Sequence, residues 1–194
     1  MSAIELHREA AHQFGKVVAA VRDDQWALPT PCEAWDVRAL VNHVVGEARW
    51  TQPLLAGLSI ADVGHSLDGD LLGADPLGAW NAACATATEE AAGEGVTERV
   101  VQLSFGDTPA EEYLRQLAAD YLVHSWDLAI AIGADSHLDA DLVSAVTAWF
   151  ADMEPHYRAA GVIGPRPAVK RIGEPQELLL AMYGRDASGG NLSG

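Results

Sequence analysis

Two histidines, each with a carboxylate one helical turn away, are the residues of this sequence that are best suited to chemistry. Asp120 precedes His124 by four residues, and Glu47 follows His43 by four. Residues at this spacing lie next to each other on one face of an α-helix. Two imidazoles and one carboxylate form a three-ligand set for a divalent metal ion, which leaves a coordination position open for water or substrate.

Both pairs fall on the side of a helix that should face the protein interior. At about 100° per residue, Leu117 and Leu128 share the face of Asp120 and His124. The opposite side of that helix is polar and should be wet, with Glu111, Glu112, Arg115 and Gln116. His43 likewise lies on the apolar side of its helix, and the outer side carries Arg38, Asn42 and Arg49. A buried carboxylate needs a partner, because an unpaired buried charge is costly.

The predicted metal ligands are therefore His43, His124 and one of the carboxylates beside them, Asp120 or Glu47. Zn²⁺ is the usual ion for such ligands, and Ni²⁺, Fe²⁺ or Mn²⁺ also fit their chemistry. Glu47 is expected directly at the ion or just beyond it, and Asp127, one turn after His124, is expected to support that imidazole. Either carboxylate is a candidate catalytic base. The spacing also allows two simpler roles, a hydrogen-bonded core histidine and an imidazole–carboxylate ion pair.

The elements that position these residues are predicted to be helical. Apolar residues recur at helical spacing in four long segments, which are residues 4–22, 37–57, 76–92 and 110–132. Asp36, and Asp75 before Pro76, are favourable N-caps, and Gly133 ends the fourth segment. We therefore predict an all-α fold, an antiparallel four-helix bundle with at most a short hairpin.

The remaining segments are predicted to extend this bundle. Residues 58–74 should form a loop, residues 100–105 should be extended, and residues 105–108 should form a turn. Two further helices are predicted, from Asp139 or Asp141 to about Arg158 and from Gln176 to Tyr183. We expect the four-helix bundle in residues 1–135, a C-terminal helical extension of the same domain in 136–186, and a flexible tail in 187–194.

The composition argues against several other functions. The chain has 194 residues, which fits one domain. Its 28 acidic and 12 basic residues give a formal charge of -16, which repels phosphate backbones, so nucleic-acid binding is not expected. No apolar run approaches the roughly 20 residues that span a bilayer. The N-terminus has no apolar signal core and the chain has only two cysteines, so we expect a cytoplasmic protein. We also expect a monomer or a homodimer.

Other residues that could do chemistry are predicted to have structural roles. Glu9 and His12 match half of a di-iron motif, but they lie opposite the apolar face of their helix. His7 is on that face and is expected to be a hydrogen-bonded core histidine. Cys32, just before the second helix, is either a reactive thiol or a small buried apolar residue, and the second role is favoured. Cys84 is expected to contribute only packing.

Three segments resemble a known family. Residues 26–46 (WALPTPCEAWDVRALVNHVVG) and 121–129 (YLVHSWDLA) resemble the two signatures of the mycothiol-dependent maleylpyruvate isomerase metal-binding domain, one of the DinB-like or YfiT-like metalloenzymes. Residues 178–186 (LLLAMYGRD) look like the short C-terminal motif of its stand-alone actinobacterial members. The resemblance covers most of the chain, from about residue 5 to residue 187.

The resemblance implies a four-helix bundle in which His43 is the first metal ligand, Asp120 the acidic ligand and His124 the last. The best-studied enzyme of the family has Glu in place of Asp120, so the carboxylate here is one methylene shorter. The implied activity is that of a thiol S-transferase or isomerase that uses mycothiol on a small electrophile. A metal-binding or stress-associated protein without turnover is the alternative. The family isomerase has a longer C-terminal domain than residues 136–186 can form, so its substrate is not carried over. Its catalytic arginine has no matching position in this sequence.

Overall fold

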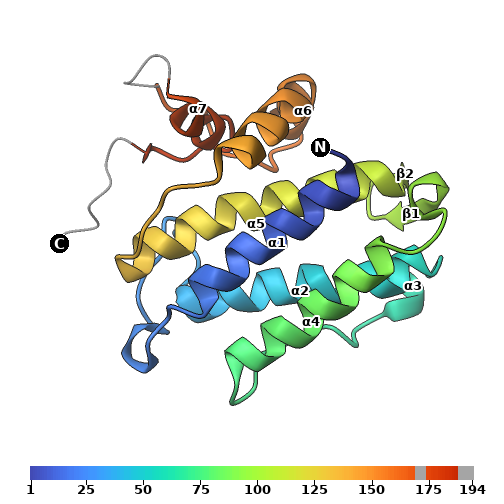
Figure 1. The fold of residues 1–194 in the computed structure, drawn as a ribbon, viewed down its shortest axis with the longest axis horizontal. Helices are drawn as coiled ribbons and strands as arrows, with labels where there is room; N and C mark the ends of the chain where they lie inside the picture. Colours follow the sequence, from blue (N-terminus) through green and yellow to red (C-terminus); the bar gives the residue numbers. More distant parts are fainter. Residues whose placement is uncertain (169–173, 188–194) are drawn as a thin grey trace.

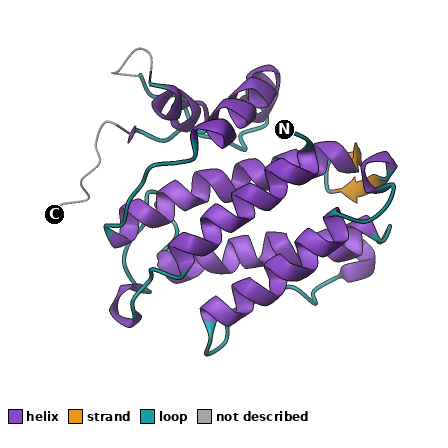
Figure 2. Cartoon of the chain, in the orientation of Figure 1, coloured by secondary structure: helices purple, strands orange, loops and turns teal. Residues whose placement is uncertain are grey.

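The protein is mostly helical, as the sequence predicts. The computed structural model describes residues 1–168 and 174–187, which contain seven α-helices and one two-stranded antiparallel hairpin (Figure 2). Two short 3₁₀ helices, η1 and η2, span Asp23–Gln25 and Val96–Glu98. Of the predicted flexible tail, 187–194, only Ala187 falls within the described residues.

Four of the helices lie side by side (Figure 1). They are α1 (Ala3–Val18), α2 (Val37–Leu55), α4 (Pro76–Ala91) and α5 (Ala110–Ile132). Both α1 and α2 pack against α4 and α5. The core that these helices share includes the fully buried side chains of Phe14, Leu40, Trp80 and Leu114. The four predicted helical segments are therefore present, although α1 ends at Val18 and not at residue 22.

Local sequence explains where three of these helices begin or end. The Asp36 carboxylate accepts a hydrogen bond from the Ala39 amide at 2.8 Å, and Asp75 accepts one from the Gly78 amide at 2.9 Å. Both are the predicted N-caps, whose side chains satisfy amides that have no partner in the first turn. Gly133 ends α5 with a φ of 68°, a left-handed conformation that glycine adopts without strain.

The connection between α2 and α4 contains a helix that the sequence analysis did not predict. Within the predicted loop 58–74, α3 (Ile60–Val63) forms a single turn. Its N-cap is Ser59, whose hydroxyl accepts a hydrogen bond from the Asp62 amide while the Asp62 carboxylate accepts one from the Ser59 amide. This reciprocal capping stabilises a turn too short to show helical periodicity.

The predicted turn at residues 105–108 is wrong by two residues. The strands of the hairpin are β1 (Val100–Leu103) and β2 (Gly106–Pro109). Leu103 pairs with Gly106, so Ser104 and Phe105 form the turn. Gly106, with a φ of 125°, follows the turn and does not occupy its centre. A two-residue turn of this kind is common in hairpins.

Helices α6 (Ala140–Ala159) and α7 (Pro175–Met182) pack against each other on one side of the four packed helices (Figure 1). Helix α6 contacts α5, and the Trp149 indole donates a hydrogen bond to Glu112 Oε2 at 2.9 Å. The side of α5 that we predicted to be wet is therefore half-buried, and residues 121–129 are all buried. The periodicity of α5 does not reveal this burial, because its polar side is covered by another helix, α6.

His7 is a buried core residue, but it lacks the hydrogen bond that we expected for it. Its ring on α1 is fully buried and lies 5.4 Å from the Tyr121 ring, between centroids. Neither ring nitrogen has a hydrogen-bond partner in the described part of the chain. Burial favours the uncharged imidazole and lowers the pKa of His7 from 6.5 to about 4. Glu9 and His12 lie on the exposed side of α1, as predicted.

We expect this histidine to make the protein sensitive to acid. Between pH 6.5 and about pH 4 the unfolded chain binds a proton at His7 and the folded protein does not, so the free energy of unfolding falls as the pH is lowered. The loss over this window is about 3 kcal/mol, at roughly 1.4 kcal/mol per pKa unit. Urea unfolding of His7→Leu at neutral and acidic pH should show that its free energy of unfolding falls less than that of the wild type, by about this amount. His12→Leu is the control, and an unchanged pH dependence in His7→Leu would contradict the prediction.

Candidate metal centre

Three side chains from two helices meet at one point in the structure. Asp120 and His124 lie one turn apart on α5, and His43 reaches them from α2, which packs against α5. Asp120 Oδ1 is 3.3 Å from His124 Nε2, and Asp120 Oδ2 is 3.6 Å from His43 Nε2. One ligand atom from each residue lies within 4.8 Å of those of the other two. The structure thus brings together the three predicted ligands, and their binding of a metal ion stays a prediction.

An aromatic ring holds the two imidazoles from one side. The centroid of the Trp35 ring lies 4.7 Å from that of His43 and 5.7 Å from that of His124. The two imidazoles meet edge-on at 5.3 Å. Trp35 belongs to the segment before α2, where its carbonyl accepts a hydrogen bond from the Thr30 hydroxyl at 2.9 Å. The segment that carries the first family signature therefore forms one wall of the site.

The three side chains differ in how far they are buried. The His124 side chain is 7% exposed, which agrees with its predicted inward direction, whereas His43 and Asp120 are 30% and 28% exposed. On α2 the core face is formed by neighbours of His43 such as Leu40 and Val44, which are fully buried. His43 is consequently at the edge of the core, where a molecule from solvent can reach it.

The charges at this point suit a cation. Asp120 Oδ2 is buried, and no hydrogen-bond donor among the described residues reaches it. Burial alone would raise the pKa of Asp120, but the imidazoles of His124 and His43 outweigh this effect and hold the pKa well below its usual value. Burial would lower the pKa of His124, but Asp120 and Asp127 raise it well above its usual value. A carboxylate therefore faces a protonated imidazole, and a divalent ion can take the place of this proton.

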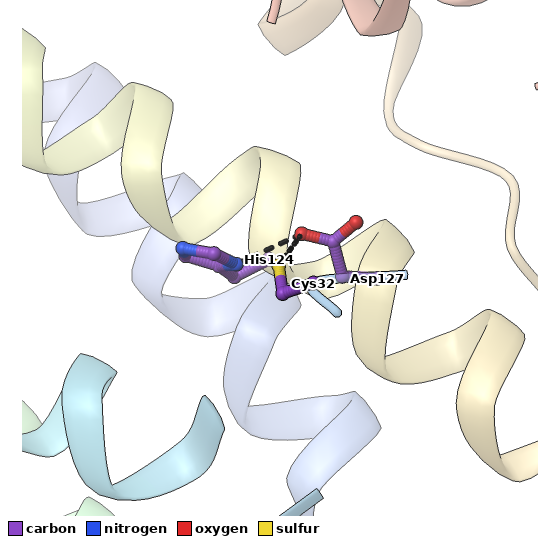
Figure 3. Close-up of side chains that lie close together, drawn as sticks. All are labelled: Cys32, His124 and Asp127. Carbon is purple, nitrogen blue, oxygen red and sulfur yellow. Dashed lines mark hydrogen bonds and ion pairs between the residues drawn. The ribbon is translucent and has the colours of Figure 1, made fainter. Parts of the chain in front are cut away.

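A second cluster lies on the other side of His124 (Figure 3). His124 Nδ1 lies 2.9 Å from Asp127 Oδ2, and the Cys32 thiol donates to the same oxygen at 3.4 Å. The Arg185 guanidinium donates to this oxygen at 2.8 Å. The Asp127 side chain is fully buried, which would raise its pKa, but His124 and Arg185 outweigh the burial and keep the pKa below its usual value.

Of these two clusters, the one around Asp120 is better suited to a metal ion. Cys32, His124 and Asp127 also place ligand atoms within 4.8 Å of one another. In that cluster, however, the Arg185 guanidinium already supplies the positive charge and also contacts Cys32 Sγ at 3.3 Å. Asp127 is therefore a paired carboxylate that holds Nδ1 of His124 and leaves Nε2 directed at Asp120, an arrangement typical of residues that support a metal ligand.

Arg185 is the residue of this site that the sequence analysis missed. It follows α7 and lies 58 residues from Asp127 in the chain, so no local spacing links the two. The resemblance of residues 178–186 to a family motif was the one signal that could have found it. The expectation that Cys32 is a buried apolar residue is also wrong, because its thiol is half-buried and has polar partners on two sides.

The candidate metal centre opens onto a cavity of about 630 Å³, a size usual for small-molecule sites. Glu47, from α2, lines this cavity but is not part of the three-residue group around Asp120 in the described chain. Burial, together with the negative charge of Asp120, raises the pKa of Glu47 to about 7. A carboxyl group with this pKa can accept or release a proton near neutral pH.

The fold and the site together define a class of protein, a mostly helical one in which two histidines and an aspartate from two neighbouring helices meet beside a cavity. The family follows from comparison with known sequences. Residues 7–129 match the mycothiol maleylpyruvate isomerase N-terminal domain, and the chain belongs to this family. The match confirms the resemblance noted in the sequence, and it includes His43, Asp120 and His124.

Two uncharacterized proteins of Mycobacterium tuberculosis are similar to nearly the whole chain. MT0763 of strain CDC 1551 / Oshkosh and Rv0738 of strain ATCC 25618 / H37Rv are each 30% identical over 191 residues, which cover 95% of this chain and 98% of the relative. No solved structure gives a significant match. Among the residues that the structure describes, no helix is long and apolar enough to cross a membrane.

Proposed function

We propose that the protein is a metal-dependent enzyme that uses the thiol mycothiol. It either transfers the mycothiol sulfur to a small electrophile or isomerises that electrophile. The observation that carries this proposal is the meeting of His43, Asp120 and His124 beside a cavity, where Asp120 Oδ2 has no hydrogen-bond donor in the described chain. Membership of the mycothiol maleylpyruvate isomerase N-terminal domain family supports the choice of thiol. We propose Zn²⁺ as the ion, with Ni²⁺ as the second choice, because both accept imidazole and carboxylate ligands.

Each side chain of the site has a role in this proposal. His43, Asp120 and His124 would hold the ion, which would lower the pKa of a thiol bound to it. Asp127 keeps the His124 ring oriented with Nε2 toward Asp120. Glu47 accepts the proton that the thiol releases and can return it to the product.

The covalent step belongs to the two small molecules. The thiolate sulfur forms a bond to an electrophilic carbon of the acceptor. In transfer, a leaving group departs with its electron pair and the sulfur stays bound to the acceptor. In isomerisation, the same carbon–sulfur bond breaks again after the acceptor has changed its geometry, and the thiol is recovered.

We also propose how the helices divide into a bundle and an extension, and in which compartment and oligomeric state the protein occurs. Helices α1, α2, α4 and α5 form the antiparallel DinB-like bundle of residues 1–135, and α6 and α7 form an extension of the same domain in residues 136–186. The packing of α1 and α2 against α4 and α5, and of α6 against α5, supports this division. We propose a cytoplasmic protein that is a monomer or a homodimer.

Metal analysis of the untreated protein tests the proposed ligands. We expect about one divalent ion per chain in the wild type and little in His43→Ala, because a three-ligand site does not tolerate the loss of one ligand well. His65→Ala removes a fully exposed imidazole whose partner is Asp68, so this variant should keep the ion. Equal metal content in the wild type and His43→Ala would remove His43 from the ligand set.

A further inference from the structure

One wall of the cavity is apolar and aromatic, and the chemistry proposed above makes no use of it. Its residues come from the hairpin turn, from α6 and from the segment after α6, namely Phe105, Trp149, Tyr157, Val162 and Ile163. The metal-binding group, in contrast, comes from α2 and α5. The cavity lining thus combines two kinds of chemistry, a polar group at Asp120 and a set of apolar residues from other elements.

Two residues of this wall are highly exposed although they are apolar. Phe105 is 71% exposed at the tip of the hairpin, and Val162 is 67% exposed in the segment after α6. They are far apart in the sequence, yet both line the cavity. Apolar side chains that gather at the edge of a cavity are typical of a ligand-binding site.

Behind these two residues the wall is held by buried contacts. The Trp149 indole N–H is already used by Glu112 Oε2, so its ring presents an apolar surface. Tyr157 packs edge-on against the buried Phe150 at 5.3 Å, and Tyr183 stacks on the same ring at 4.1 Å. A preformed wall of aromatic rings suits a flat apolar molecule, because rings bind one another by stacking or edge contacts.

The charges around the cavity disfavour an anionic molecule. Glu33, Glu47 and Asp120 line it, and Arg185 is the one lysine or arginine among the described lining residues. Arg185 is bound to the buried Asp127 carboxylate through two hydrogen bonds, at 2.8 and 3.3 Å. The lining thus offers no unpaired lysine or arginine among the described residues to bind a carboxylate or phosphate at the apolar wall, and the imidazoles of His43 and His124 face Asp120.

The two parts of the cavity also differ in how they relate to the family. The predicted metal ligands lie within residues 7–129, which match the family, whereas Trp149, Tyr157 and Val162 lie beyond them. Phe105 lies within the matched residues, so the part of the chain that is shared with the family is combined with a wall that comes mostly from beyond it. This arrangement is expected when the same chemistry is applied to a different substrate.

We infer that this wall is the subsite for the electrophile, and that the electrophile is an uncharged aromatic or similarly flat apolar molecule and not a carboxylate. The role of this molecule as the acceptor of a thiol rests on the proposed function. The existence of the subsite does not rest on it, since its residues come from other elements than those of the metal-binding group.

Equilibrium dialysis of the full chain with 4-nitrobenzamide and 4-nitrobenzoate tests the inference, because these unreactive molecules have nearly the same shape and differ in charge. We expect the neutral amide to bind at least about tenfold more tightly than the carboxylate. Phe105→Ser and Val162→Ser should each weaken amide binding by about threefold to tenfold. Leu58→Ser, at a 41% exposed apolar residue outside this cavity, should leave binding unchanged. All three residues are exposed, so the variants should fold.

Three results would overturn the inference: no binding of the amide, tighter binding of the carboxylate, or amide binding that neither Phe105→Ser nor Val162→Ser affects. Separate calorimetry with mycothiol tells this failure apart from failure of the proposed function. Amide binding as expected, in a protein that does not bind mycothiol in a metal-dependent way, would support the subsite and reject the thiol reaction.

Discussion

Mycothiol should bind the metal-loaded wild-type protein and should not bind the His124→Ala variant. His124 is the most firmly held of the predicted ligands, because Asp127 Oδ2 lies 2.9 Å from Nδ1 while Nε2 faces Asp120 at 3.3 Å. Loss of a residue that only supports a ligand lowers metal affinity about 10- to 100-fold, and loss of a ligand should cost more. We therefore expect His124→Ala to lose at least about 100-fold in metal affinity, and mycothiol binding with it.

Calorimetry can measure both parts of this expectation. Mycothiol is titrated into metal-loaded and metal-free protein, in buffers that differ in ionisation enthalpy. Binding should be tighter with the metal and should release a proton, because the thiol binds as its thiolate. Circular dichroism of His124→Ala should show an intact helical fold. If metal-loaded wild-type protein does not bind mycothiol more tightly than metal-free protein, the function is that of a metal-binding protein without this turnover.

The variant Cys32→Ala tests whether the attacking sulfur belongs to the protein or to mycothiol. Cys32 Sγ contacts Asp127 and Arg185, but in the proposed reaction the attacking sulfur belongs to mycothiol. Mycothiol binding and proton release should therefore be nearly unchanged in this variant. If Cys32→Ala alone destroyed activity, the nucleophile would be on the chain, and the mechanism proposed here would be wrong.

The helices could be predicted from the sequence because their signals are local. Apolar periodicity and end residues such as Asp36, Asp75 and Gly133 act within one or two turns, and α5 has the bounds that these signals predict. The half-burial of the polar side of α5 could not be predicted in this way. It depends on α6, which brings Trp149 to Glu112 across 37 positions of the chain.

The candidate site shows the same division between local and distant signals. The pairing of Asp120 with His124 follows from their spacing on one helix, and so does the contact of Asp127 with His124. The approach of Cys32 and Arg185 to Asp127 spans 95 and 58 positions, and no periodicity encodes it. Local spacing therefore indicates the arrangement of Asp120, His124 and Asp127 on α5. The approach of His43 from α2 follows from the inward faces of the two helices and the family resemblance, and the ion pair behind His124 is visible only in three dimensions.

The ion pair of Asp127 and Arg185 carries the second large expected effect. Asp127→Leu should destabilise the protein by about 3–5 kcal/mol, because this is the usual result of removing one partner of a buried pair. Asp127 is fully buried and Arg185 is 20% exposed. Without the carboxylate, the guanidinium and His124 Nδ1 both lose their partner. Urea unfolding measures the loss. Asp70→Leu, which breaks an exposed pair with Arg38 at 2.9 Å, is the control and should change stability far less.

The double variant Asp127→Leu/Arg185→Met separates the ion pair from a packing defect. A buried pair replaced by apolar residues of similar size is often neutral for stability, so the double variant should recover most of what Asp127→Leu loses. Additive losses would contradict the coupling of the two residues. His124 still lacks its acceptor in the double variant, so metal affinity should stay about 10- to 100-fold below that of the wild type. If metal affinity returned together with stability, Asp127 would act on the fold alone and would not position His124.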